Sequence, residues 1–284
     1  AAALAAGLAG GAGAQTQGVS DDEVVFGSVN DLSGIFAAVG VPAVNGANLR
    51  FDEVNAAGGV HGRKIEFLSV DDAYSPPKAV EQARRLIESE EIDVLYAPLG
   101  TPSNTAIQKY VNARKVPHLF LATGASKWND PTNYPYTTGW QPNYPTESKI
   151  YVQYIKEHIE DPKIAILYQN DDYGKDYLHG IHAGLGDRKD LIVAETPYEV
   201  SQPTVDSEVI SLKSSGANVF FIICTPKFAA QAVKKSHEIG WEATRFLNNV
   251  SVSVGSVLKP AGLEASKGLI SAGYLMEVDD PQWA

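Results

Sequence analysis

The stretch Tyr96-Ala97-Pro98-Leu99-Gly100-Thr101-Pro102-Ser103-Asn104 joins an apolar run to a segment with helical periodicity. Residues 92–96 are typical of a buried parallel strand, and apolar residues recur at helical spacing over 105–112. We predict that Thr101 caps this helix, because a first-turn proline follows it and its hydroxyl can accept from a free backbone N–H. The N–H groups of Ser103 and Asn104 would then face the carboxyl end of a strand, where open α/β sheets bind ligands. This stretch by itself favours an ordinary capped loop, with an anion-binding loop as the alternative that the rest of the chain supports.

Strand-like runs alternate with amphipathic helical segments on both sides of this stretch. The predicted strands are 24–30, 64–70, 92–96 and 118–121, followed after a break by 163–169, 191–198, 218–224 and 244–247. The predicted helices are 42–55, 75–88, 102–112, 176–185, 206–214 and 227–239, and the first is expected to bury Val44, Ala47, Phe51 and Val54. Two successive runs of this kind predict an α/β fold with two doubly wound parallel-sheet lobes joined by a hinge.

The break between the two runs sets the expected domain boundaries. Residues 131–145 are rich in proline and aromatic side chains, so we predict lobe one over 19–141 and lobe two over 142–272, with 273–284 returning to lobe one. Residues 1–18 carry no charge and are mostly Ala, Gly and Leu. We interpret them as the remnant of a secretory signal peptide with Ala12-Gly13-Ala14 as its cleavage site, the alternative being a flexible linker.

Charge and titratable residues argue against several classes of function. The chain of 284 residues has a formal net charge of −11 with both signs interspersed, which argues against nucleic acid as a partner. Its six histidines show no metal-ligand spacing, so we predict neither a metal nor a cofactor. The single Cys224 lies in a buried-strand pattern and cannot form an internal disulfide. No run after residue 18 is long and apolar enough to cross a bilayer, so no membrane insertion is expected.

The sequence favours a binding protein over an enzyme. It contains no nucleophile elbow, no P-loop and no dinucleotide-binding glycine pattern after a strand. The carboxylate pairs Asp71-Asp72 and Asp171-Asp172 follow predicted strands, where adjacent side chains point to opposite faces. They are therefore poorly placed to act as an acid–base pair, and turn formation and helix capping are their expected roles.

Four segments resemble the type 1 periplasmic solute-binding proteins of ABC importers, in the group that binds branched-chain amino acids. The most specific is Asn55-Ala56-Ala57-Gly58-Gly59-Val60-His61-Gly62-Arg63-Lys64 with the preceding 40–46, and the others are 71–80, 164–174 and 268–270. The chain is most similar to the members that import aromatic carboxylic acids, through residues 101–104, 139–142, 169–177, 229–232 and 239–241.

This resemblance implies a monomeric, non-catalytic, two-lobed periplasmic protein. Such a protein closes on a small carboxylate and delivers it to an ABC permease. A ligand-sensing receptor ectodomain is the alternative of another class.

The resemblance also implies where the ligand binds. In the family, loops after the third and fourth strands of lobe one hold the ligand carboxylate, and these positions correspond here to Thr101, Ala122, Thr123 and Gly124. A lobe-two tyrosine that closes over the ligand corresponds to Tyr173.

Further contacts are predicted from neighbouring loops. Phe36 and Trp140, together with Tyr173, are candidates for contacts to an apolar ligand body. The predicted site is completed by Ser103, Thr225 and Asn249. Each ring also has a structural alternative, in which Trp140 packs at the hinge, Phe36 anchors its loop and Tyr173 caps its own turn.

The loop at 247–251 bears on the class of ligand. Members that bind amino acids carry an acidic residue there, whereas this loop reads Leu247-Asn248-Asn249-Val250-Ser251. A buried ammonium without a counter-charge is strongly unfavourable. We therefore predict an aromatic monocarboxylate, with a branched-chain or other amino acid as the alternative if Asp31 or Asp171 supplies the charge.

Estimates of the binding free energy support a carboxylate ligand with an apolar body. A helix terminus contributes about 0.3–2 kcal/mol to anion binding, and micromolar affinity requires about 8 kcal/mol. Enclosing an aromatic ring adds about 4 kcal/mol before ordering costs. Apolar enclosure between the lobes must therefore supply much of the affinity.

The carboxyl-terminal end carries a further expectation. A strand near 267–272 should lead back toward lobe one, and the sequence ends at Ala284, where members of the family continue. We expect a C-terminal portion to be absent and lobe one to expose a contiguous apolar patch larger than a few hundred Å².

Overall fold

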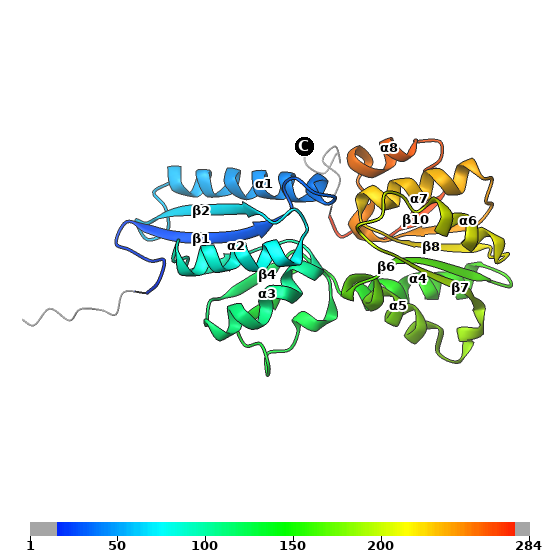
Figure 1. Cartoon of the computed structure of the whole chain (residues 1–284), viewed down its shortest axis with the longest axis horizontal. Coiled ribbons are helices and arrows are strands. Elements are labelled where there is room, and N and C mark those ends of the chain that lie inside the picture. Colours follow the sequence, from blue (N-terminus) through cyan, green and yellow to red (C-terminus); the bar gives the residue numbers. More distant parts are fainter. Residues whose placement is uncertain (1–15, 276–284) are drawn as a thin grey trace, which may run out of the picture.

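The computed structural model describes residues 16–275 and shows two parallel β-sheets side by side, with helices above and below each (Figure 1). Sheet one has the strand order β2-β1-β3-β4-β5, and sheet two has the order β10-β9-β8-β6-β7. Every strand pair in the two sheets is parallel. The predicted α/β class with two doubly wound parallel sheets is confirmed.

The elements follow one another along the chain with few long connections. Sheet one and its helices comprise β1 (Glu23–Asn30), α1 (Ala37–Ala56), β2 (Lys64–Asp71), α2 (Pro76–Glu88), β3 (Val94–Tyr96), α3 (Thr101–Ala113), β4 (His118–Leu121) and β5 (Thr137–Gly139). Sheet two and its helices comprise α4 (Tyr144–His158), β6 (Ile164–Gln169), α5 (Asp172–Leu185), β7 (Ile192–Tyr198), α6 (Asp206–Ser214), β8 (Val219–Ile223), α7 (Pro226–Glu238), β9 (Thr244–Leu247), α8 (Lys259–Ala261) and β10 (Leu269–Ser271).

Side chains of sheet one alternate between its two faces, as the two-residue period of a strand requires. Val29 and Leu95 lie in the core formed with α2 and α3. Phe26 and Tyr96 point to the other face, where their rings lie 5.6 Å and 5.4 Å from that of Phe51 in α1. The carboxyl ends of these strands are thereby held at one edge of the sheet.

Helix α1 covers its face of sheet one only in part. The predicted stripe of Val44, Ala47, Phe51 and Val54 is half-buried rather than buried, and Gly40 is the buried residue of this helix. Beyond α1 on the outer strands, Phe120 is 42 % exposed and Trp140 66 % exposed, with their rings 6.1 Å apart. Exposed aromatic side chains therefore lie on lobe one, while the area of the expected patch stays a prediction.

Sheet two is covered on both faces. All five residues of β8 are buried, as expected for a strand with helices above and below. Phe220 and Ile222 pack with α6 and α7, whereas Phe221 and Ile223 pack with α4 and α5.

The passage at 131–145, predicted to be irregular, contains a strand and the start of a helix. Strand β5 adds to the edge of sheet one beside β4. Helix α4 begins at Tyr144, and the Asn143 side chain caps it by accepting from the Thr146 N–H at 3.2 Å. The chain thus passes from one sheet to the other between residues 139 and 144, and the predicted lobe boundary at 141/142 stays a prediction.

The ends of the chain were predicted to be a leader remnant and a returning segment. Residues 1–15 and 276–284 lie outside the described part. Gln17 is held on lobe one, because its Nε2 donates to the carbonyls of Ile87 and Ile92 at 2.9 and 3.2 Å. Strand β10 lies at the edge of sheet two beside β9. Within residues 16–275, no helix has the length and apolar character needed to span a bilayer.

A buried histidine links the core of lobe one to the loop before α3. His118 is fully buried, and its Nε2 lies 2.8 Å from Asn104 Oδ1. The Asn104 amide nitrogen donates to the carbonyls of Pro98 and Gly100, so its oxygen is the acceptor and His118 Nε2 carries the proton. Burial lowers the pKa of His118 to about 3.

We expect His118 to make the protein sensitive to acid. Because the pKa of the folded state lies below the ordinary value, the unfolded chain takes up the proton first. The free energy of unfolding should therefore fall as pH decreases from about 6.5 toward 3, by about 2 kcal/mol between pH 7 and pH 5. Urea titrations across this range measure the change. His118→Gln, which retains an N–H for Asn104, should flatten the slope, and an unchanged slope in this variant would refute the assignment.

Candidate functional site

A cavity of about 260 Å³ lies between the two sheets, at the edge where their strands end. It receives residues from the loops after β1, β2, β3 and β4 of sheet one and from the loops after β6, β8, β9 and β10 of sheet two. Among the described residues that line it, none has a charged side chain. The cavity is therefore apolar with a small number of neutral polar groups, the usual character of a small-molecule site.

Six of the nine predicted site residues line this cavity. They are Phe36, Thr101, Ala122, Tyr173, Thr225 and Asn249. The other three, Ser103, Thr123 and Gly124, lie behind the cavity wall. The Trp140 ring does not line the cavity either, because it packs against Phe120 on the exposed part of lobe one.

The N-terminus of α3 differs from its prediction by one residue. Gly100, with φ 94°, occupies the cap position, and Thr101 is the first helical residue. A side chain at position 100 would place its Cβ 2.7 Å from Tyr74 Cε2, so glycine is required both by the backbone and by the neighbouring ring. Thr101 therefore does not cap the helix, and it lies in the cavity wall instead.

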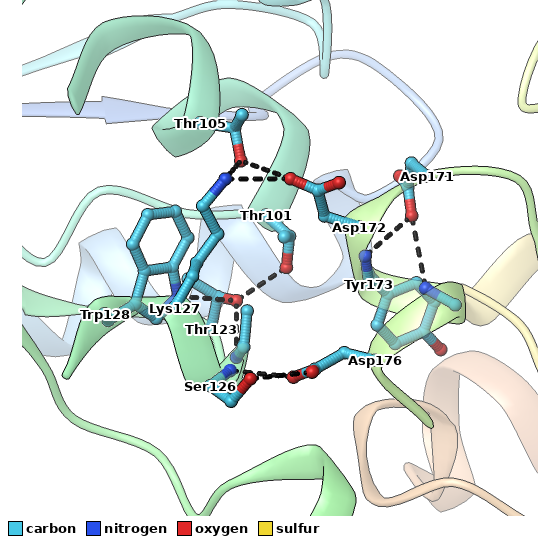
Figure 2. Close-up of polar contacts among 12 residues, drawn as sticks. Thr101, Thr105, Thr123, Ser126, Lys127, Trp128, Asp171, Asp172, Tyr173 and Asp176 are labelled. Carbon is cyan, nitrogen blue, oxygen red and sulfur yellow. Dashed lines mark hydrogen bonds and ion pairs between the residues drawn. The ribbon is translucent and has the colours of Figure 1, made fainter. Parts of the chain in front are cut away.

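A chain of hydrogen bonds orients the Thr101 hydroxyl (Figure 2). Thr123 Oγ1 accepts from the Trp128 indole N–H and from the Ala125 N–H, both at 3.3 Å. The Tyr144 hydroxyl, 3.5 Å away, is a third donor toward Thr123 Oγ1. Because three donors face this oxygen, its own O–H points to Thr101 Oγ1, 2.6 Å away. Thr101 lines the cavity, and its own O–H can donate to a ligand or to the neighbouring Tyr144 hydroxyl.

Other predicted carboxylate donors are already used within the protein. The N–H of Ala122 donates to Pro98 and that of Thr123 to Leu121, at 3.0 and 2.8 Å. The Ser103 hydroxyl donates to the buried Asp72 at 2.5 Å. These three groups are thus engaged in local hydrogen bonds, and their contact with a ligand stays a prediction.

Gly124 shapes the wall in a different way from the predicted one. A Cβ at this position would lie 2.7 Å from the Tyr144 ring and 2.3 Å from the Pro142 carbonyl oxygen. Its carbonyl accepts from the Tyr144 N–H at 2.9 Å. Gly124 therefore allows Tyr144, a lining residue, to approach lobe one.

The loops that carry Phe36 and Tyr74 are held by buried carboxylates. Asp31 accepts from the N–H groups of Ser33, Gly34 and Phe36, and Asp72 accepts from the Tyr74 N–H at 2.8 Å. Tyr74 has φ 56°, a conformation that is strained for a bulky residue. Its ring meets that of Phe36 edge-on at 5.4 Å, and this pair forms one apolar wall of the cavity.

Tyr173 provides an unsatisfied polar group on the lobe-two side. Its side chain is 2 % exposed, and its hydroxyl has no hydrogen-bond partner among the described residues. An unpaired buried hydroxyl costs about 1–3 kcal/mol, which a ligand acceptor would recover. Asp171 caps the same helix by accepting from the N–H groups of Tyr173 and Gly174, so the capping role predicted for the Asp171-Asp172 pair is confirmed for Asp171.

Among the lining residues that were not predicted, five have polar side chains. They are Tyr74, Gln141, Tyr144, Ser253 and Tyr274. Tyr74 follows the predicted strand 64–70 closely, so its position at a strand end was a usable signal. The other four depend on how α4, the segment after β9 and the exit of β10 meet, which the local sequence pattern does not specify.

The two lobes also meet through exposed polar contacts beside the cavity (Figure 2). Asp172 at the start of α5 accepts from Lys127 Nζ at 2.8 Å and from Thr105 Oγ1 at 3.3 Å. One turn later, Asp176 accepts from the Ser126 N–H and hydroxyl, each at 2.7 Å. The same helix therefore carries both a residue of the cavity wall, Tyr173, and these contacts to lobe one.

Comparison with known proteins gives the family. A family model described as periplasmic binding protein matches residues 23–282. The chain belongs to the periplasmic binding protein family. The proteins of this family and its structural neighbours are solute-binding proteins.

Relatives of this periplasmic binding protein are longer than the present chain. It is 25% identical over 276 residues to a protein of Brucella abortus (strain 2308) named Leu/Ile/Val-binding protein homolog 7, covering 92% of this chain and 66% of the relative. Homolog 8 from the same strain is 24% identical over 266 residues, covering 89% and 64%. The chain thus spans about two thirds of the length of these curated relatives.

Solved structures agree with the fold. A substrate-binding periplasmic protein from Ralstonia solanacearum superposes with a TM-score of 0.79 at 26% identity, covering 86% of this chain and 69% of that one. A possible leucine/isoleucine/valine-binding protein from Rhodopirellula baltica gives a TM-score of 0.80 at 19% identity, covering 88% and 68%.

We expect the Asp176 contacts to favour the closed arrangement of the lobes. Asp176→Ala removes both hydrogen bonds to Ser126 and should shift the equilibrium toward open forms by about 1 kcal/mol, a factor of roughly five. Small-angle X-ray scattering should then give a larger radius of gyration than in the wild type. Asp190→Ala, which removes an exposed carboxylate without such contacts, is the matched control. Equal radii in the two variants would contradict the role of Asp176.

Proposed function

We propose that this periplasmic binding protein is a non-catalytic, extracytoplasmic receptor that captures a small apolar carboxylate between its lobes and delivers it to an ABC permease. The observation that carries the proposal is a cavity whose described lining residues have no charged side chain and whose wall carries the hydroxyls of Thr101 and Tyr173, that of Tyr173 having no hydrogen-bond partner among the described residues. Hydroxyl groups can donate hydrogen bonds to an anionic group of the ligand, and the remaining apolar wall can pack against an apolar ligand body.

Helix termini supply the positive potential that an anion requires. Thr101, Tyr173 and Thr225 lie at the N-terminal ends of α3, α5 and α7, and all three line the cavity. Each terminus presents the positive end of a helix dipole, worth about 0.3–2 kcal/mol for an anion in a favourable geometry. Phe36, Tyr74 and the other apolar residues then enclose the rest of the ligand.

The same cavity argues against a ligand ammonium. Asp31 and Asp171 were the two residues that could have replaced the missing acid of the 247–251 loop. Asp31 accepts three backbone N–H groups, and Asp171 accepts from Tyr173, Gly174 and the Gln169 side chain, so both are used by the protein. An aromatic monocarboxylate is therefore favoured over an amino acid.

A branched-chain amino acid is the second candidate ligand. It is favoured by one finding, the name Leu/Ile/Val-binding protein carried by relatives at 24 and 25% identity. The ligand screen below separates the two candidates directly.

A thermal-shift screen tests the proposed ligand class. Benzoate and cinnamate at millimolar concentration are expected to raise the melting temperature, since a ligand that binds only the folded state stabilises it. Leucine, isoleucine and valine serve as the competing series. A clear shift with leucine and none with any aromatic acid would overturn the aromatic assignment.

Thr101 is expected to contribute directly to binding the carboxylate. Thr101→Val should weaken the binding of benzoate or cinnamate by about 1–3 kcal/mol, because a charged acceptor loses its donor. Thr123→Val should weaken it less, because Thr123 only orients Thr101. Thr138→Val on the exposed face of β5 is the control. Calorimetric titration measures all three, and unchanged affinity in both Thr101→Val and Thr123→Val would place the carboxylate elsewhere.

A further inference from the structure

A buried carboxylate stands behind the lobe-two wall of the cavity. Glu147 on α4 is 4 % exposed and does not line the cavity. One of its oxygens accepts from the Tyr151 hydroxyl at 2.6 Å and from the Asn249 N–H at 2.8 Å. The other accepts from the Tyr177 hydroxyl at 2.7 Å and from the Asn249 side-chain nitrogen.

This carboxylate fixes which way the Asn249 amide points. An ionised carboxylate only accepts, so the Asn249 Nδ2 must face Glu147, and a reversed amide would place two oxygens against each other. The amide oxygen is left as the free end of a side chain that lines the cavity. Within residues 16–275, no group donates a hydrogen bond to Asn249 Oδ1.

The surrounding groups hold Glu147 in this arrangement. Burial raises the pKa of Glu147, and its hydrogen bonds from Tyr151, Tyr177 and Asn249 oppose that effect. Tyr151 also lies 3.0 Å from the Leu247 carbonyl and accepts from the Ala272 N–H at 2.8 Å. Both strands that lead to the cavity wall are therefore tied to the same centre.

We infer that Glu147 is a specificity-determining positioning residue, which keeps the Asn249 oxygen available so that the site selects a carboxylate carrying a neutral hydrogen-bond donor. This inference rests on the proposed function, in which the ligand carboxylate binds at Thr101. The two polar ends of the cavity then offer different hydrogen-bonding groups. Hydroxyl donors lie on the Thr101 side, and an amide acceptor lies at Asn249.

The donor is a neutral hydroxyl rather than an ammonium. Each Glu147 oxygen already accepts two hydrogen bonds from the protein, so the carboxylate offers no free oxygen to the cavity. An amide oxygen alone satisfies a hydroxyl, whereas it leaves a desolvated cation without a counter-charge. The ligand class is thus a hydroxylated acid with an apolar body.

Calorimetric titration with matched acids tests the inference. The probes are benzoate with 3-hydroxybenzoate and 4-hydroxybenzoate, and cinnamate with 4-hydroxycinnamate. In the wild type, at least one hydroxylated acid is expected to bind about tenfold more tightly than its parent. Glu147→Gln permits either amide orientation at Asn249, so this ratio should fall toward one while the affinity for the parent acid changes less than threefold.

Two further variants keep the test decisive. Tyr177→Phe removes one donor to Glu147 and a 3.5 Å contact from Asn249 Nδ2, but it leaves both hydrogen bonds from Asn249 to Glu147 in place, so it should retain the tenfold ratio. Asn249→Ala removes the oxygen itself and should abolish the ratio even if Glu147→Gln fails to fold, which circular dichroism would reveal.

The outcomes separate this inference from the proposed function. Parent acids that bind without any preference for their hydroxylated forms would overturn the inference and leave the proposed function intact. A preserved ratio in Glu147→Gln or in Asn249→Ala would also overturn it, as would tighter binding of leucine than of every hydroxylated acid. Absence of binding by all carboxylates would instead refute the proposed function.

Discussion

The site depends on one constraint, which is that every buried carboxylate around the cavity is satisfied by the chain itself. Asp31 and Asp72 are bound by loop N–H groups and Ser103, and Glu147 by two tyrosines and Asn249. A buried charge that lacked such partners would cost several kcal/mol and would seek a cation. Because hydrogen bonds from the protein satisfy these carboxylates, none of them lines the cavity, and the described side chains that do line it are neutral.

The architecture could be predicted from the sequence because strands that are buried on both faces consist of consecutive apolar residues. Residues 219–224 form an uninterrupted apolar run, and the structure buries all of β8. Elements with weak local signals were missed. Strand β5 has three residues, Thr-Thr-Gly, and α4 begins at Tyr144-Pro145 within a proline-rich passage, so neither shows the period that identifies a strand or helix.

The site could be predicted only as far as strand ends and family resemblance reach. Thr101 and Tyr173 follow strands and reach the cavity, but Thr123 and Ser103, which also follow strands, turn to hydrogen bonds with Thr101 and Asp72. Nothing local distinguishes the two outcomes, because they depend on partners from other loops. The role of Glu147 could not be predicted from the sequence for the same reason. Its role arises from contact with Asn249, 102 residues away along the chain.

The arrangement of α5 has a practical consequence for detecting ligands. This helix brings Tyr173 to the cavity and Asp172 and Asp176 to lobe one, so its surroundings depend on how close the two lobes lie. His179 lies on the same helix with an exposed side chain. Cys224 is the one cysteine of the sequence and is fully buried, and burial raises the pKa of its thiol, so it resists thiol reagents. In a His179→Cys variant a fluorescent dye would thus attach selectively to this helix, where it would report the binding of any ligand that changes the surroundings of α5.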